Sequence, residues 1–146
     1  MKVLLLLADA AQTVDGKLYI LGGGWSITGP GPAQMAIVMK FEVPWDQANR
    51  SHRWTLMLVT TDGKPVELPV ADGSAVGTIE VSGQFEVGRP PALARGTTLD
   101  VPVTINLGPL PLPPGERYEW RLTVDDESRE DWRLAFQTRP AVEPAG

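Results

Sequence analysis

The chain has 146 residues, of which 42% are hydrophobic and 21% charged, and it carries a net charge of −5. This length suits a single domain, and the apolar content is that of a folded chain rather than a disordered one. An acidic protein lacks the basic surface by which proteins bind nucleic acids or anionic membranes. The absence of cysteine excludes disulfides, thiolate metal sites and cysteine nucleophiles, and it fits a reducing compartment, so we expect a cytoplasmic protein.

The chain opens with an apolar run, V-L-L-L-L-A at residues 3–8. It has no polar face, which indicates a strand buried on both sides rather than a surface helix. Lys2 and the A-D-A sequence at 8–10 resemble parts of a secretion signal. However, the run is shorter than the roughly 7–15 apolar residues of such signals, and no segment approaches the ~18 that a membrane helix needs. We therefore expect neither secretion nor a membrane partner.

The first 25 residues are predicted to form one hairpin. Asp15-Gly16 is a turn dipeptide, and K-L-Y-I-L at 17–21 returns as a second strand rich in β-formers. Three glycines at 22–24 then let the backbone bend, so that Trp25 can fold over the core.

Further strands are predicted from alternating apolar residues at 35–43, 54–60, 78–87, 99–107, 118–124 and 132–136. Asp62-Gly63 and Asp72-Gly73 are predicted turns around a short extended piece at 65–70. Gly83 interrupts the inner face of its strand and is expected to mark a bulge. The proline-rich segment 107–115 is expected to cross one end of the fold without pairing, although such a run could also dock into an aromatic groove of a partner.

These patterns predict an all-β protein, a two-sheet antiparallel β-sandwich of about eight strands of the immunoglobulin or C2 type. A closed barrel is the alternative. One domain is expected over residues 1–139, followed by a disordered C-terminal tail at 140–146.

Three motifs carry a family resemblance: A-D-A-A-Q at 8–12, D-G-K-L-Y-I-L-G-G-G-W at 15–25 and V-P-W-D-Q-A-N-R at 43–50. They resemble a family of small, uncharacterised actinobacterial β-sandwich proteins. The resemblance implies a single cytosolic domain of this fold, and it brings no activity, ligand or catalytic residue with it.

Few residues offer chemistry. His52 is the only histidine, and it stands in a polar stretch between Arg50 and Arg53, so we expect it to be solvated in a loop. A catalytic triad or a two-histidine metal site would therefore need residues from a second subunit. The glycines at 22–24 are not followed by a predicted helix, which a phosphate-binding loop requires.

Carboxylates crowd the predicted turn at 125–131. This turn could supply oxygen ligands for calcium, which prefers six to eight of them. The candidate metal ligands are Asp125, Asp126, Glu127 and Asp131. The run lacks the spacing of a calcium-binding loop, and the same residues could instead be a solubilising turn or, less readily, a catalytic carboxylate pair.

The sequence contains five tryptophans. Trp54, Trp120 and Trp132 fall on apolar strand faces and are predicted core residues. Trp25 and Trp45 fall at strand ends, where an exposed indole could stack on a sugar ring or on a partner. They are the candidate ligand-binding residues, with covering of the core as the alternative role.

The leading hypothesis is a non-enzymatic protein without a cofactor that acts through protein–protein contacts, including self-association. The apolar second faces of residues 3–8 and 54–60 favour it, because each must be covered by loops or by another subunit. The alternative is a small-ligand or carbohydrate-binding module, with or without calcium, and an enzyme ranks third.

Overall fold

The computed structural model describes residues 1–69 and 76–141, and most of them lie in strands. In chain order the elements are β1 (Lys2–Val14), β2 (Lys17–Gly23), β3 (Ile27–Thr28), β4 (Ala33–Val43), the 3-10 helix η1 (Trp45–Gln47), β5 (Ser51–Thr60), β6 (Glu67–Pro69), β7 (Val76–Thr78), β8 (Glu80–Glu86), β9 (Leu99–Leu110), β10 (Arg117–Val124) and β11 (Glu127–Thr138). Within these two ranges there is no helix with the length and apolarity that a membrane crossing needs.

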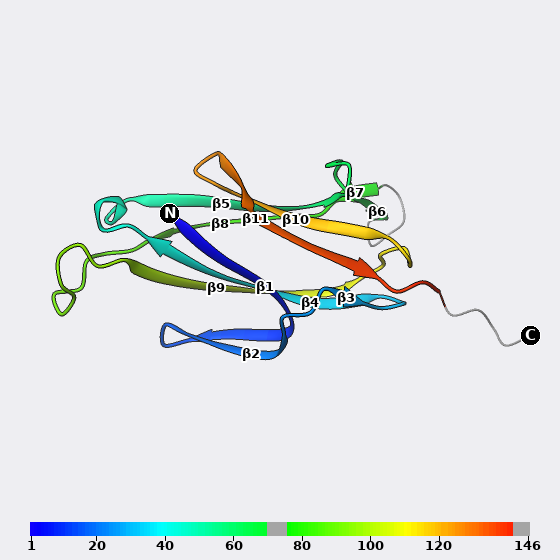
Figure 1. Ribbon diagram of the computed structural model, residues 1–146, viewed down its shortest axis with the longest axis horizontal. Coiled ribbons are helices and arrows are strands. Elements are labelled where there is room, and N and C mark those ends of the chain that lie inside the picture. Colours follow the sequence, from blue (N-terminus) through cyan, green and yellow to red (C-terminus); the bar gives the residue numbers. More distant parts are fainter. Residues whose placement is uncertain (70–75, 142–146) are drawn as a thin grey trace, which may run out of the picture.

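The strands form two main sheets that face each other. The first has the order β2-β1-β4-β9, and the second has the order β3-β11-β10-β5-β8. A small ribbon of β6 and β7 is added at one end, and neighbours are antiparallel except for β3 on β11. Figure 1 shows β5, β8 and β10 above β1, β4 and β9. The predicted all-β fold with antiparallel sheets is confirmed. Each of the eight predicted strands corresponds to one of the longer strands, and β6 lies in the short extended piece predicted at 65–70, whereas the short strands β3 and β7 were not predicted.

The core lies between the two sheets and is built from alternate residues of their central strands. The first sheet contributes Met35, Ile37, Met39 and Phe41 from β4, and the second contributes Leu56, Leu58, Trp120 and Leu122 from β5 and β10. All of these side chains are buried. Trp54, Trp120 and Trp132 are buried as well, which confirms the prediction that they are core residues.

Two predictions about backbone irregularities are wrong. Gly83 is no bulge, because β8 keeps an unbroken register with β5 from Glu80 to Glu86. Its missing side chain instead makes room for Trp54, since a Cβ at Gly83 would lie 2.6 Å from Cζ2 of the indole. The proline-rich segment also pairs further than expected, because β9 runs through Pro109 to Leu110. A proline is tolerated there because β9 is an edge strand of its sheet.

The apolar second faces predicted to need covering are only partly covered. Val59 of β5 is buried where Pro65 pairs with it. In the first apolar run, Leu7 and Ala8 are buried, but Leu4 is half exposed. Burial on both faces therefore holds only at the end of that run, beyond which β1 pairs with β2.

The last strand, β11, ends at Thr138. The predicted turn Asp72-Gly73 and most of the expected tail, residues 142–146, lie outside the described residues.

Candidate functional site

The hairpin of β1 and β2 begins as part of the first sheet and then leaves it. Residues Lys2 to Ala8 of β1 pair with β4, whereas residues from Ala8 onward pair with β2. The predicted turn Asp15-Gly16 closes the hairpin, and both of its residues have positive φ, 51° and 71°. These are the angles of the two-residue turn that matches the twist of antiparallel strands. We call residues 9–23 the hairpin arm.

One asparagine of β9 fixes the hairpin arm to the sheet. The side-chain amide of Asn106 accepts a hydrogen bond from the Ala11 N–H (3.1 Å) and donates one to the Ala11 carbonyl (2.8 Å). It therefore satisfies both backbone groups that Ala11 presents on the side away from β2. The hydroxyls of Thr13 and Thr104 add a contact of 3.1 Å.

A small second core lies under the arm. It consists of the buried residues Ala8, Ala11, Ala36 and Val38, against which Leu6 and Leu18 pack. These side chains are mostly small, which lets the arm lie close to the sheet. The outer face of the first sheet is thus covered in part by its own hairpin.

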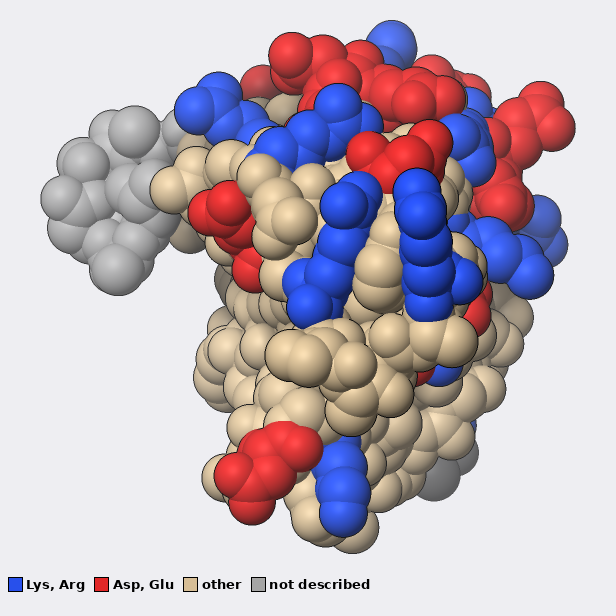
Figure 2. All heavy atoms as spheres, turned by 90° about the vertical axis from the view of Figure 1, so that its left-hand side faces the viewer, with Lys and Arg blue, Asp and Glu red and all other residues tan. Residues whose placement is uncertain are grey.

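The outer surface of the arm remains apolar and open to solvent. Tyr19 is 54% exposed and Leu21 is 69% exposed, and the other exposed large apolar residues of β1 and β2 are Leu4, Val14 and Ile20. In the part of the chain that the structure describes, only Ile27 and Leu93 are comparable elsewhere. Charged side chains gather over the upper part of the molecule, while its lower part, where β2 lies in Figure 1, is mostly uncharged (Figure 2).

The edge of β2 is also unpaired, since β2 is the outermost strand of its sheet in the described part of the structure. Proteins usually protect such edges with charged residues, prolines or bulges, because open N–H and C=O groups pair with other chains. In β2 the only charged residue is Lys17 at its start. The free edge of β2 therefore has unpaired backbone groups, and the side chains beside it are mostly apolar.

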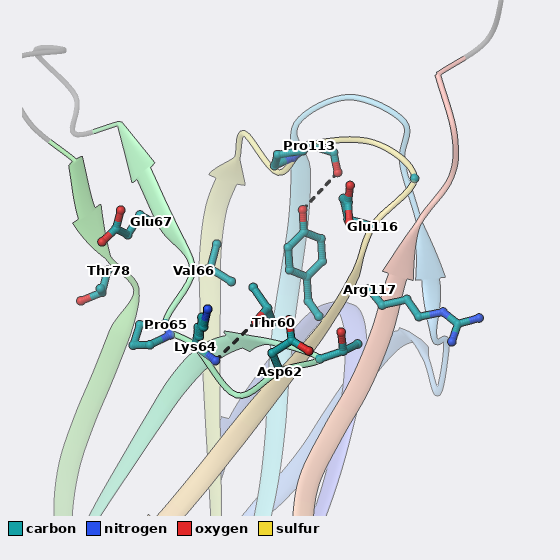
Figure 3. Close-up of a pocket in the computed structure, with 13 residues that line it drawn as sticks. Thr60, Asp62, Lys64, Pro65, Val66, Glu67, Thr78, Pro113, Glu116 and Arg117 are labelled. Atoms are coloured by element: carbon teal, nitrogen blue, oxygen red, sulfur yellow. Dashed lines mark hydrogen bonds between the residues drawn. The ribbon is translucent and has the colours of Figure 1, made fainter.

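A second feature is a cleft of about 1020 Å³ at the end of the second sheet (Figure 3). It is lined by residues 60–62, 64–67, 78, 113 and 115–118. Its buried residues are Val66 and Tyr118, and the Tyr118 hydroxyl donates a hydrogen bond of 3.2 Å to the Pro113 carbonyl. The base of the cleft is thus formed by buried side chains, one of them fixed by a hydrogen bond, and its walls are polar.

The charges of the cleft are mixed. Asp62, Glu67 and Glu116 are carboxylates, whereas Lys64 and Arg117 are cations. Figure 3 shows the Arg117 side chain directed away from the other residues. Burial, together with the charge of nearby Glu116, raises the pKa of the Tyr118 hydroxyl, which therefore stays protonated as a hydrogen-bond donor. Hydroxyls and charges of both signs on the walls suit a polar small molecule better than an apolar one.

The two tryptophans predicted to bind a ligand each pack against another side chain. Trp25 is partly buried and meets Phe136 edge to face, with ring centroids 6.3 Å apart. Trp45 is also partly buried, and the Arg89 guanidinium lies 5.1 Å from its ring centroid. Arg89 also donates to the Trp45 carbonyl, which holds it there. Both indoles pack against the core, as their alternative role requires.

In the acidic turn at 125–131, Asp125 bonds to a histidine from another strand, and the carboxylates do not gather into a cluster. Asp125 accepts a hydrogen bond from His52, and its other oxygen accepts one from the Arg53 N–H. Asp126, Glu127 and Asp131 are exposed, and Glu127 pairs with Arg129. Among residues 1–69 and 76–141, no three histidine or acidic side chains come close enough together to hold a metal ion.

His52 lies where the sequence did not place it. The expectation of a solvated loop histidine is wrong, because His52 is in β5 and only 1% exposed. Its Nδ1 lies 2.7 Å from Asp125 Oδ2, and its Nε2 lies 2.8 Å from the Gln47 carbonyl. These two contacts join η1 to the turn after β10, and we call them the His52 clasp.

Comparison with known families identifies the chain. A family of unknown function, DUF6941, matches residues 3–137. The chain belongs to this family. No curated protein and no solved structure matches it.

The DUF6941 match spans the whole hairpin arm, Asn106 and the cleft. Sequence reasoning predicted the hairpin and its turn, but it missed the exposed surface of β2 and the role of Asn106. Asn106 is a polar residue on the outward face of an alternating strand, a position that usually meets water. The only signal in the sequence for the role of Asn106 was a polar side chain on the outward face of β9, together with a hairpin that is unusually apolar.

Proposed function

We propose that the protein acts through protein–protein contacts made by the hairpin arm, with the free edge of β2 as the pairing surface. The observation that supports this most directly is the combination of an open strand edge with the two most exposed apolar side chains of β2, Tyr19 and Leu21. An extended segment of another chain that adds to such an edge gains backbone hydrogen bonds and buries the flanking side chains. No catalytic step enters this proposal.

The arm is built to present this surface rigidly. The Asn106 amide and the small core under Leu18 hold it against the sheet, so that pairing requires little further ordering of β2. Charged side chains are sparse over this part of the molecule (Figure 2), which also lowers the desolvation cost of covering it.

The test is site-specific photo-crosslinking in cells of the native host. A photoreactive residue placed at Leu21 should give discrete protein adducts, because this side chain lies beside the pairing edge. The matched control is the same residue at Leu93, which is 40% exposed but lies far along the chain in the loop before β9. Adducts confined to Leu21 support the proposal, whereas none at Leu21, or equal adducts at both positions, would refute it.

A second candidate function is the binding of a small polar ligand in the cleft of Figure 3. Its size supports this, since ligand pockets span roughly 300–1,000 Å³ and the cleft reaches about 1020 Å³. Thermal unfolding with calcium, with chelator and with soluble glycans tests this candidate. A ligand at a hundred times its Kd adds ~2.7 kcal/mol to the free energy of unfolding. A flat panel would remove these ligands from consideration.

We also propose that the protein works in the cytoplasm of an actinobacterium. The support for the compartment is the absence of cysteine from the sequence, and the support for the source is the resemblance carried by the motifs at 8–12, 15–25 and 43–50. Fractionation of cells that produce the native protein tests the compartment.

A further inference from the structure

The hydrogen-bond pattern between β1 and β2 determines which N–H and C=O groups of β2 point to its free edge. In an antiparallel ladder, opposed residues alternate between pairs that exchange hydrogen bonds and pairs that do not. The N–H and C=O of Ala11 both bond to the Asn106 side chain, on the side away from β2. The pair of Ala11 and Ile20 is therefore one of the pairs without hydrogen bonds, and the N–H and C=O of Ile20 point to the free edge.

Leu18, two residues earlier in β2, must point the same way as Ile20. The residue between them, Tyr19, bonds instead to Gln12 of β1. Beyond Ile20 the regular edge ends, because Gly22 has a φ of 59°. The free edge thus offers two donors and two acceptors, from Leu18 and Ile20.

We infer that a second copy of this chain occupies the edge, with β2 pairing antiparallel to β2 of the other copy about a two-fold axis at Tyr19. This inference rests on the proposed function and names its partner. In this register Leu18 of each copy exchanges two hydrogen bonds with Ile20 of the other, which makes four in all. Every open backbone group of the regular edge is then satisfied by its own symmetry mate.

The side chains are compatible with the same register. Tyr19 faces Tyr19 of the second copy in a pair without hydrogen bonds, where Cβ atoms approach to about 4.5–5.5 Å and aromatic pairs stabilise the sheet. Lys17 faces Leu21 of the second copy, so no like charges oppose each other. An interface that pairs a patch with itself is the usual arrangement of a two-fold dimer.

Net charge does not prevent this dimer. Each chain carries −5, but the charged side chains gather on the part of the molecule away from β2 (Figure 2). Charges farther apart than a Debye length of about 8 Å are largely screened at physiological salt. A short paired edge buries less than the ~800 Å² per partner of a standard interface, so we expect a weak dimer that forms at high protein concentration.

Cysteine crosslinking tests the register, because the natural chain has no cysteine that could compete. In a Tyr19→Cys variant the two thiols of the dimer lie directly opposite each other and should form a disulfide within the dimer. In Leu21→Cys, the matched control on the same strand, the two cysteines lie four residues apart along the paired strands, about 13 Å at ~3.3 Å per residue. The Tyr19→Cys variant should therefore crosslink at least about tenfold faster, to a species of twice 15.8 kDa.

Sedimentation of the unmodified protein completes the test, because it needs no substitution. The sedimentation coefficient should rise with concentration up to about 1 mM, and Tyr19→Asp, which opposes two carboxylates, should weaken the association at least about tenfold. A protein that stays monomeric, or equal crosslinking of the two cysteine variants, would overturn the self-pairing. The proposed function would then still be decided by the crosslinks at Leu21 in cells, which report any protein partner.

Discussion

His52 and Asp125 form a hydrogen bond of 2.7 Å between Nδ1 and Oδ2, across 73 residues of sequence. The other ring nitrogen faces the Gln47 carbonyl at 2.8 Å. Both ring nitrogens face oxygen atoms, so the imidazole bridges the Asp125 carboxylate and the Gln47 carbonyl. The pair joins β5 to the turn between β10 and β11, next to η1.

Removal of the histidine should destabilise the protein markedly. His52→Ala leaves a cavity and deprives a carboxylate and a carbonyl of their donor, so the free energy of unfolding should fall by about 2–4 kcal/mol. Urea unfolding followed by tryptophan fluorescence measures this. A loss below about 0.5 kcal/mol, typical of surface substitutions, would mean that His52 is a solvated residue after all.

Acid should weaken the same clasp. Burial opposes the ionisation of Asp125, but the hydrogen bonds from His52 and from the Arg53 N–H, with the charges of His52 and Arg50, outweigh it and hold the pKa of this carboxyl below its usual 3.8. A pKa that is lower in the folded state stabilises the protein above the pKa of the unfolded chain. This stabilisation is lost as the pH falls from about 3.8 through the folded value.

In Asp125→Asn the free energy of unfolding should therefore change less steeply with pH over this acidic range than in the unmodified protein. Because the Asp125 side chain is 48% exposed, solvent screening keeps the difference to about 1 kcal/mol or less. Asp126→Asn removes a carboxylate from the same turn without touching His52, and it serves as the control. Equal pH profiles for the two variants would count against the clasp.

The indole of Trp54 fills the space next to Gly83. A methyl group there would lie 2.6 Å from Cζ2 of the indole, so Gly83→Ala must displace a core side chain and should cost about 1–3 kcal/mol. At Gly108 no atom lies within 4 Å of an added Cβ, and Gly108→Ala should be nearly neutral. Thermal unfolding of the two alanine variants separates them, and equal melting temperatures would disprove the close packing.

Asn106 should stabilise the hairpin arm but contribute little to the stability of the rest of the domain. Asn106→Ala leaves the Ala11 N–H and C=O without a protein partner, which should weaken the arm by about 1 kcal/mol. Amide hydrogen exchange should become faster in residues 9–23 and stay unchanged in the centre of β4 and β10. Thr104→Val, which removes only the contact to Thr13, should have a smaller effect. Uniformly faster exchange in Asn106→Ala would show that the residue supports the whole domain.

Local signals in the sequence were sufficient for most of the fold. The alternation in 35–43, 78–87 and 118–124 predicted β4, β8 and β10, and Asp15-Gly16 predicted the first turn, because these features depend on neighbours along the chain. The same local reasoning failed at the end of β9, where Leu110 pairs with Ala33 beyond Pro109 and β9 is an edge strand. Edge positions are set by the order of strands, which alternation does not encode.

The site was harder to predict because its residues act through distant partners. His52 looked solvated beside two arginines, but its burial depends on Asp125, which is far away in sequence. The second face of the first apolar run was expected to need a cover, and it has one at Ala8. That the cover is the hairpin arm, held by Asn106, depends on a bend of β1 that no local pattern announced.

Amide hydrogen exchange along β2 tests the central claim, that its free edge pairs with another chain, most directly. It is measured on isotope-labelled protein when dilute, when concentrated and in an excess of unlabelled extract from the native host. The amides of Leu18 and Ile20 should exchange quickly in dilute protein and become protected when a partner strand is present. The Tyr19 amide, already bonded to β1, should stay equally protected throughout. Fast exchange of Leu18 and Ile20 under every condition, or new protection confined to other strands, would contradict the account.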